Sequence, residues 1–288
     1  MVRLEFSIQL AYEVLQPSCS FVFNIQAAHT ARQTVVRESL LLNQNLATSS
    51  YTDPATHSRL LRLRAKSGLF TVLYSAVVEL THHQAVPAQL AERSPQDLPG
   101  DVLHYLYPSR YCQSDRLLNL AGDVFGHLPP GYSRAQAICD WVQQNVRFQG
   151  NSSNSATSAL DTLVERVGVC RDFAHLMIAL CRATNLPARM ASGIDYGADT
   201  ILGPPDFHAY VEVFLGEHWY MFDPSGTAVP MGFVRFGTGR DAADIAFATI
   251  FGVVSAAQPV IQMQAVPNGQ GELLLPQHLG CALSTDGP

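Results

Sequence analysis

The stretch Gly168-Val-Cys-Arg-Asp-Phe-Ala-His-Leu-Met-Ile-Ala-Leu-Cys-Arg-Ala-Thr184 determines how the second half of the chain folds. Apolar residues recur at helical spacing from Ala174 to Cys181, which predicts a helix with one face buried against a core. Gly168 interrupts the preceding helical pattern and Pro187 follows the helix, so Cys170 is expected in the first turn. Unpaired N–H groups and the positive end of the helix dipole stabilise a thiolate there. The same N–H groups can form one arm of an oxyanion hole.

A single cysteine is weak support for a nucleophile, because free cysteines are commonly small buried hydrophobes. Cys181 lies three helical turns after Cys170 on the apolar face and is expected in the core. The other cysteines are scattered, and no export signal precedes them, so free thiols are expected. No CxxC, HExxH or Cys/His cluster occurs in the sequence, and we predict neither a metal site nor another cofactor.

Two alternating runs, His208-Ala-Tyr-Val-Glu-Val-Phe-Leu215 and Trp219-Tyr-Met-Phe-Asp223, predict a β-hairpin. The Gly-Glu pair near their junction favours a two-residue type II′ turn, which sets Tyr210 opposite Asp223. His208, Tyr210 and Asp223 then share one face of the hairpin, with Asp223 diagonal to His208 and within side-chain reach. A three-residue loop would move Asp223 to the opposite face.

Taken together, Cys170, His208 and Asp223 form the set of residues that acyl transfer by a thiolate requires. Cys170 would attack a carbonyl carbon, His208 would act as the base, and Asp223 would orient that base. His175 is a rival base, but it follows Cys170 by five residues on the same helix. Its side chain is therefore rotated by about 140° around the helix axis and points elsewhere.

Four sequence blocks in this order resemble the bacterial transglutaminase-like superfamily: Gly168–Leu176, Leu186–Arg189, Phe207–Phe214 and Trp219–Pro224. The resemblance covers roughly residues 110–255, and the first hundred residues resemble the N-terminal region of many members. It implies a papain-like core with a Cys-His-Asp triad, which carries over to Cys170, His208 and Asp223.

One departure limits what the resemblance implies. Arg171 follows the cysteine, where animal transglutaminases have Trp, and the chain has no room for their calcium-binding and additional β domains. Protein cross-linking and calcium dependence are therefore not implied. We predict thiol-dependent acyl transfer on a peptide or amide substrate, with hydrolysis favoured over transamidation. A non-catalytic papain-like binding or scaffold module is the alternative. Gln149 and Asn151 are open candidates for a second oxyanion donor.

The predicted fold class is α+β, with a β-rich N-terminal domain over residues 1–100 and a transglutaminase-like catalytic domain over residues 101–288. The first part contains five apolar, partly alternating runs, which predict an antiparallel sandwich or barrel: Val2–Leu15, Ser20–Ala27, Thr34–Leu41, Leu60–Lys66 and Leu69–Val78. The longest apolar stretch, Ile245 to Ala257, is too short to span a bilayer, so a buried core segment is expected.

The chain has 18 basic and 24 acidic residues, a net charge of −6, which argues against nucleic acid as a partner. The basic run Arg59–Lys66 alternates like a strand with one solvated face. No signal-peptide pattern opens the sequence, so a cytoplasmic protein without a membrane partner is expected. The oligomeric state is not determined by the sequence. The loop Asp195–Asp206, directly before His208, either shapes the mouth of the cleft or is a plain surface connection.

Overall fold

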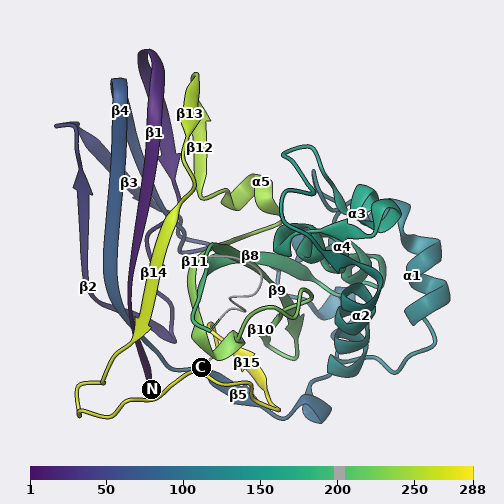
Figure 1. Ribbon diagram of the computed structural model, residues 1–288. Coiled ribbons are helices and arrows are strands. Elements are labelled where there is room, and N and C mark those ends of the chain that lie inside the picture. The colour runs from purple at the N-terminus through teal and green to yellow at the C-terminus, as the bar shows by residue number, and fades with distance from the viewer. Residues whose placement is uncertain (198–204, 288) are drawn as a thin grey trace.

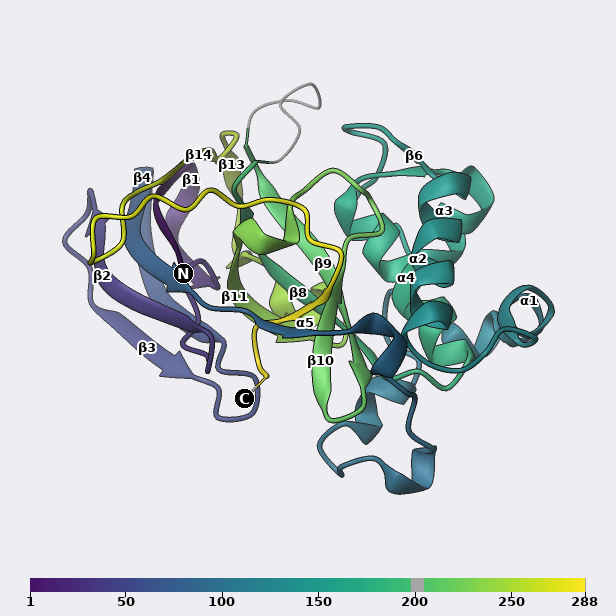
Figure 2. The same ribbon diagram turned by 90° about the horizontal axis from the view of Figure 1, so that it is seen from below.

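The computed structural model describes residues 1–197 and 205–287 and arranges them in three layers. A long-stranded sheet, a four-stranded sheet and a group of helices lie side by side (Figures 1 and 2). Strands and helices are segregated along much of the chain, so the predicted α+β class is confirmed. Within the described residues, no helix combines the length and apolar character needed to cross a bilayer.

The first sheet draws its strands from both ends of the chain. Its members are β1 (Val2–Phe23), β2 (Gln33–Leu42), β3 (Thr48–Thr52), β4 (Arg59–Leu80), β12 (Ala248–Phe251), β13 (Val254–Ala256) and β14 (Val260–Ala265). The second sheet has the order β10-β9-β8-β11 and is formed by β8 (Ala188–Asp195), β9 (Phe207–Leu215), β10 (His218–Phe222) and β11 (Phe233–Gly239).

The helices are α1 (Leu118–Phe125), α2 (Tyr132–Asn145), α3 (Ala159–Glu165), α4 (Cys170–Ala183) and the short α5 (Ala242–Ile245). Two small pairs of strands complete the fold: β5 (His83–Ala85) with β15 (Ala282–Ser284), and β6 (Arg147–Phe148) with β7 (Val167–Gly168). Ser158 and Asp161 form a capping box at the start of α3. The sequence Ser133-x-x-Gln136 has the pattern of a capping box, but it does not cap α2, which begins one residue earlier at Tyr132.

The first sheet folds back on itself. Tyr12 and Phe21 are nine residues apart on β1 and would be about 30 Å apart on a straight strand. Their ring centroids are nevertheless 5.1 Å apart, and Phe70 of β4 lies 5.2 Å from Phe21. A bulge between Val14 and Ser18 interrupts the β1–β4 register where β1 turns over in Figure 1. One bent sheet thus encloses its own aromatic core, as a sandwich does.

The N-terminal sheet is not formed by the first hundred residues alone. β12, β13 and β14 pair in turn with successive parts of β1, along the edge that β4 leaves free. Without these strands, β1 would expose a long row of unpaired backbone groups. Phe6 of β1 also packs on Phe236 of β11 at 6.0 Å, so the two sheets share a core. The packing therefore does not follow the predicted division into residues 1–100 and 101–288.

The prediction of a buried segment at Ile245–Ala257 is wrong. This stretch forms β12 and β13 at the edge of the first sheet, and Phe251 and Val253 are 61% and 58% exposed. Backbone hydrogen bonds to β1 hold the segment, Ile245 is its one residue in the buried core, and Ala248, Ile250 and Val254 are only partly buried. An apolar run alone does not distinguish a buried core segment from a strand at the edge of a sheet.

Helix α4 is the central helix of the molecule. It packs against β9 on one side and against α2 and α3 on the other (Figure 2). Every residue from Asp172 to Arg182 is buried, whereas the sequence pattern predicts one buried face. A helix covered on all sides is fixed in position, so the residue at its start is fixed as well. The predicted start of α4 at Cys170 is confirmed.

Candidate active site

Cys170 is the first residue of α4 and is partly exposed. The carboxylate of Asp172 caps this helix start, because its Oδ2 accepts a hydrogen bond from the N–H of Val169 at 2.8 Å. Gly168 makes room for that carboxylate: a Cβ atom at this position would lie 2.7 Å from the Cβ of Asp172. The glycine that interrupts the sequence pattern is therefore needed for the geometry of the helix start.

Two backbone N–H groups at this helix start are available to a ligand. The N–H groups of Asp172 and Phe173 bond to the carbonyl of Val169. The N–H groups of Cys170 and Arg171 have no acceptor within the helix, as is true of the first N–H groups of any helix. The side-chain oxygen of Gln149 accepts a hydrogen bond from Arg147 at 3.1 Å, which leaves its amide NH2 group to donate, and its backbone N–H donates to the carbonyl of Gly168 at 2.9 Å. Gln149 therefore lies beside the start of α4, and Gln149 and Asn151 both stay candidates for the second oxyanion donor.

The β9–β10 hairpin has the predicted register. Leu215 lies opposite His218, and the pairing continues to Val211 opposite Phe222, which brings Asp223 alongside Tyr210. Gly216 has a φ of +58°, the left-handed conformation that the first residue of a type II′ turn requires. His208 and Asp223 consequently meet on one side of the hairpin, as predicted.

The His208 Nε2 atom lies 3.3 Å from Oδ1 of Asp223. That carboxylate is itself held in place: Oδ1 accepts from the Ser225 hydroxyl at 2.6 Å, and Oδ2 accepts from the N–H of Ala228 at 3.0 Å. Because Nε2 is engaged with Asp223, Nδ1 is the ring atom left to face Cys170, whose Sγ lies 3.9 Å from the carbonyl oxygen of Phe207, the residue before His208. The structure therefore joins His208 to Asp223 and places Cys170 next to the start of the strand that carries His208.

The electrostatics of this cluster favour a charged His–Asp pair. Burial alone would lower the pKa of His208, but Asp223 and Cys170 outweigh burial and raise its pKa well above the ordinary value. Burial alone would raise the pKa of Asp223, but His208 and the hydrogen-bond donors around the carboxylate hold its pKa below the ordinary value. Both side chains are less than a tenth exposed, so solvent screens this attraction only weakly.

His175 does not belong to the cluster. Its Nε2 accepts a hydrogen bond from the N–H of Ala242 at 3.2 Å, and its ring stacks on Tyr111 with centroids 4.9 Å apart. Burial lowers the pKa of His175 to about 3, so the ring is neutral at ordinary pH. The prediction that this histidine points away from the site is confirmed.

Arg171 links the cysteine helix to the polar loop before α3. Its Nη2 donates to the hydroxyl of Ser153 at 3.1 Å and to the carbonyl of Asn154 at 2.9 Å. The residue that distinguishes this chain from animal transglutaminases therefore anchors a loop next to the nucleophile position. Of the predicted loop Asp195–Asp206, residues 198–204 are outside the described residues.

Sequence reasoning missed the residues that support Asp223. Ser225 lies two residues further on, and its hydroxyl donates a hydrogen bond to the carboxylate. The Asp-Pro-Ser sequence could have suggested this local interaction. Asp195 and Tyr210 form a second buried pair beside His208. No local signal identifies Asp195, because its place depends on how β8 pairs with β9.

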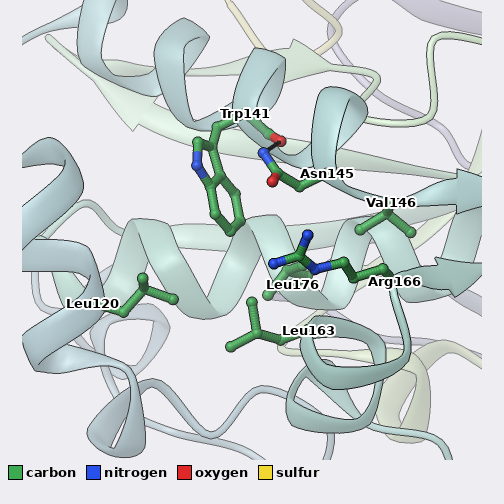
Figure 3. Close-up of a pocket in the computed structure, with 7 residues that line it drawn as sticks. All are labelled: Leu120, Trp141, Asn145, Val146, Leu163, Arg166 and Leu176. Carbon is green, nitrogen blue, oxygen red and sulfur yellow. Dashed lines mark hydrogen bonds between the residues drawn. The ribbon is translucent and has the colours of Figure 1, made fainter.

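An apolar cavity of about 220 Å³ lies elsewhere, among α1, α2, α3 and α4 (Figure 3). Its lining residues are Leu120, Trp141, Asn145, Val146, Leu163, Arg166 and Leu176. None of the three clustered residues reaches it, so it is separate from the candidate active site. Among the described residues, no group of three or more His, Cys, Asp or Glu side chains is arranged to hold a metal ion.

Cys170 begins the central helix α4, and the His208–Asp223 pair lies on the β9–β10 hairpin, against which α4 packs. Residues 119–224 match the model of the transglutaminase-like superfamily, and residues 2–93 match that of the bacterial transglutaminase N-terminal domain. The chain belongs to the transglutaminase-like superfamily.

Similar proteins include one of known structure and several mycobacterial proteins. A crystal structure of a candidate cysteine protease from Cytophaga hutchinsonii has a TM-score of 0.90 and 38% identity, covering 98% of this chain and 97% of that one. A protein of Mycobacterium leprae is 29% identical over 64% of this chain and 68% of its own length. A protein of Mycobacterium tuberculosis is 32% identical over 36% of this chain and 37% of its own length, so the chain spans little more than a third of that relative.

Proposed function

We propose that the protein is a cysteine hydrolase that cleaves peptide or amide bonds through an acyl-enzyme on Cys170. The observation that carries the proposal is the position of His208, which lies 3.3 Å from Asp223 and directly follows Phe207, whose carbonyl oxygen lies 3.9 Å from Sγ of Cys170. The positions of Cys170 at a helix start and of Asp223 among backbone donors support the same roles.

In the proposed reaction the Cys170 thiolate attacks the carbonyl carbon, and a sulfur–carbon bond forms. The N–H groups of Cys170 and Arg171 stabilise the negative charge that develops on the carbonyl oxygen. The carbon–nitrogen bond then breaks, and the amine leaves with the proton from Nδ1 of His208. Water attacks the thioester, His208 takes up its proton, and the carboxylic acid departs as the thiolate is restored.

Asp223 keeps the imidazole in the orientation that both steps need. Its fixed carboxylate directs Nε2–H toward Oδ1, so Nδ1 exchanges protons with sulfur and substrate. The elevated pKa of His208 means that the imidazolium is the resting form at neutral pH.

Hydrolysis is favoured over transamidation because water is abundant and no described side chain marks a site for an acceptor amine. The likeness to a candidate cysteine protease over nearly the whole chain supports a peptide or amide substrate.

The experiment is a screen of peptide and amide libraries with wild type, Cys170→Ala and a control, Cys281→Ala. Cys281 is also partly exposed but lies near β15, away from the cluster. We expect turnover by wild type and Cys281→Ala and none by Cys170→Ala. Adding a primary amine and analysing the products by mass spectrometry separates a carboxylic acid product from a new amide. Turnover that persists in Cys170→Ala would overturn the proposal.

A further inference from the structure

A second buried carboxylate lies beside the proposed triad and has no part in the steps above. Asp195 is the last residue of β8 and is 7% exposed. Its Oδ2 accepts a hydrogen bond from the hydroxyl of Tyr210, and its Oδ1 accepts one from the N–H of Val229 at 3.2 Å. Among the described residues, no lysine or arginine forms an ion pair with it. A buried acid with only neutral donors is costly, which suggests a functional reason for its presence.

Tyr210 connects this carboxylate to the histidine. It follows His208 by two residues on β9, so the two side chains share a face of the strand. Their rings meet edge to face with centroids 4.8 Å apart. The Tyr210 ring is fully buried and packs on Phe233 at 4.4 Å, so the ring is held from both sides.

We propose that Asp195, acting through Tyr210, is a positioning residue that fixes the plane of the His208 ring and favours its imidazolium form. The proposal rests on the proposed function. Its first part is geometric: the Tyr210 hydroxyl is anchored on Asp195, so the ring edge against which His208 packs cannot move. Its second part is electrostatic, because Asp195 adds a second negative charge near an imidazole that already faces Asp223.

The charged and titratable groups around His208 come from four places. Cys170 faces it from α4, Asp223 from the end of β10, Tyr210 from β9, and Asp195 from β8. The neighbouring strand β11 places apolar Phe233 opposite Asp195. Burial raises the pKa of Asp195 to about 7, against the opposing effects of His208 and Tyr210. Asp195 is therefore ionised in the alkaline range, where His208 loses its proton, and it delays that loss.

The test uses iodoacetate, whose negative charge is attracted by the imidazolium. Alkylation of Cys170 by this reagent should slow when His208 loses its proton, which gives the pH profile an alkaline limb. In Asp195→Asn we expect that limb to move to lower pH by about one unit, the size of a nearby-charge effect. Tyr210→Phe keeps the ring, removes the donor to Asp195 and should move the limb in the same direction.

Asp241→Asn is the matched control, since Asp241 is equally buried and accepts two backbone N–H bonds beside His175, away from the triad. Its profile should coincide with that of the wild type. An alkaline limb unchanged in both Asp195→Asn and Tyr210→Phe would overturn the positioning role while leaving the proposed function intact. A wild-type profile with no alkaline limb would instead show that no imidazolium at His208 assists the alkylation, and this result would contradict both proposals.

Discussion

Replacing Asp223 with Asn should destabilise the protein in a pH-dependent way. The His208–Asp223 pair is 3.3 Å apart, and both side chains are less than a tenth exposed. Removing one partner of such a buried pair costs about 3–5 kcal/mol, because the other charge is left without a partner. Asp223→Asn keeps the size of the side chain, so most of this cost should come from the lost charge.

The sign follows from the two pKa shifts. The pKa of His208 is raised in the folded state, so its contribution is complete below about pH 6.5 and is lost as pH rises through the folded value. The pKa of Asp223 is lowered, so its contribution is present above about pH 4 and is lost as pH falls through the folded value. The loss in free energy of unfolding that Asp223→Asn causes should therefore be largest between these two pH limits.

The assay is urea unfolding of wild type and Asp223→Asn at pH 5.5 and at pH 9.5. We expect the larger deficit at pH 5.5 and a smaller one at pH 9.5. Asp241→Asn is again the control, because burial keeps its neighbour His175 neutral at both pH values. A deficit of Asp223→Asn that is equal at the two pH values would refute the charged pair.

Three further variants test the fold around the site. Gly168→Ala should lower the free energy of unfolding by about 1–3 kcal/mol, because the added Cβ would clash with Asp172 at the start of α4. Gly150→Ala is its control: a Cβ there meets no atom within 4 Å, so this variant should unfold at the wild-type temperature. Asp286→Asn leaves buried Arg235 without its 2.8 Å partner, so urea unfolding at pH 7 should show a loss of about 3 kcal/mol. Phe70→Ala empties the core of the bent sheet and should cost about 3–5 kcal/mol in the same assay, and a loss under 1 kcal/mol would contradict that core.

Local chemistry explains why the site could be predicted from the sequence. The Gly-Glu turn sets the register of the hairpin, and the register brings His208 and Asp223 to the same side. The interruption at Gly168 sets the start of α4 and with it the place of Cys170. Each of these signals acts over a few residues, whereas the approach of Cys170 to the start of β9 also depends on the packing of α4 against that strand.

The features that the sequence did not predict depend on contacts between distant segments. The strands at 248–265 pair with β1 across more than two hundred residues, and nothing in their local pattern names that partner. The bend of the first sheet arises from a bulge at Val14–Ser18, where a plain break between two strands fits the sequence equally well. Asp195 comes close to His208 only because β8 lies next to β9.

The most direct test of the central claim is competitive labelling of the free thiols with limiting iodoacetamide at pH 6, followed by peptide mass spectrometry. In the proposed mechanism His208 activates the thiol of Cys170, so we expect Cys170 to react at least about tenfold faster than partly exposed Cys281. This advantage should disappear in His208→Ala. Equal labelling of Cys170 and Cys281 in the wild type would contradict the account and favour a non-catalytic module.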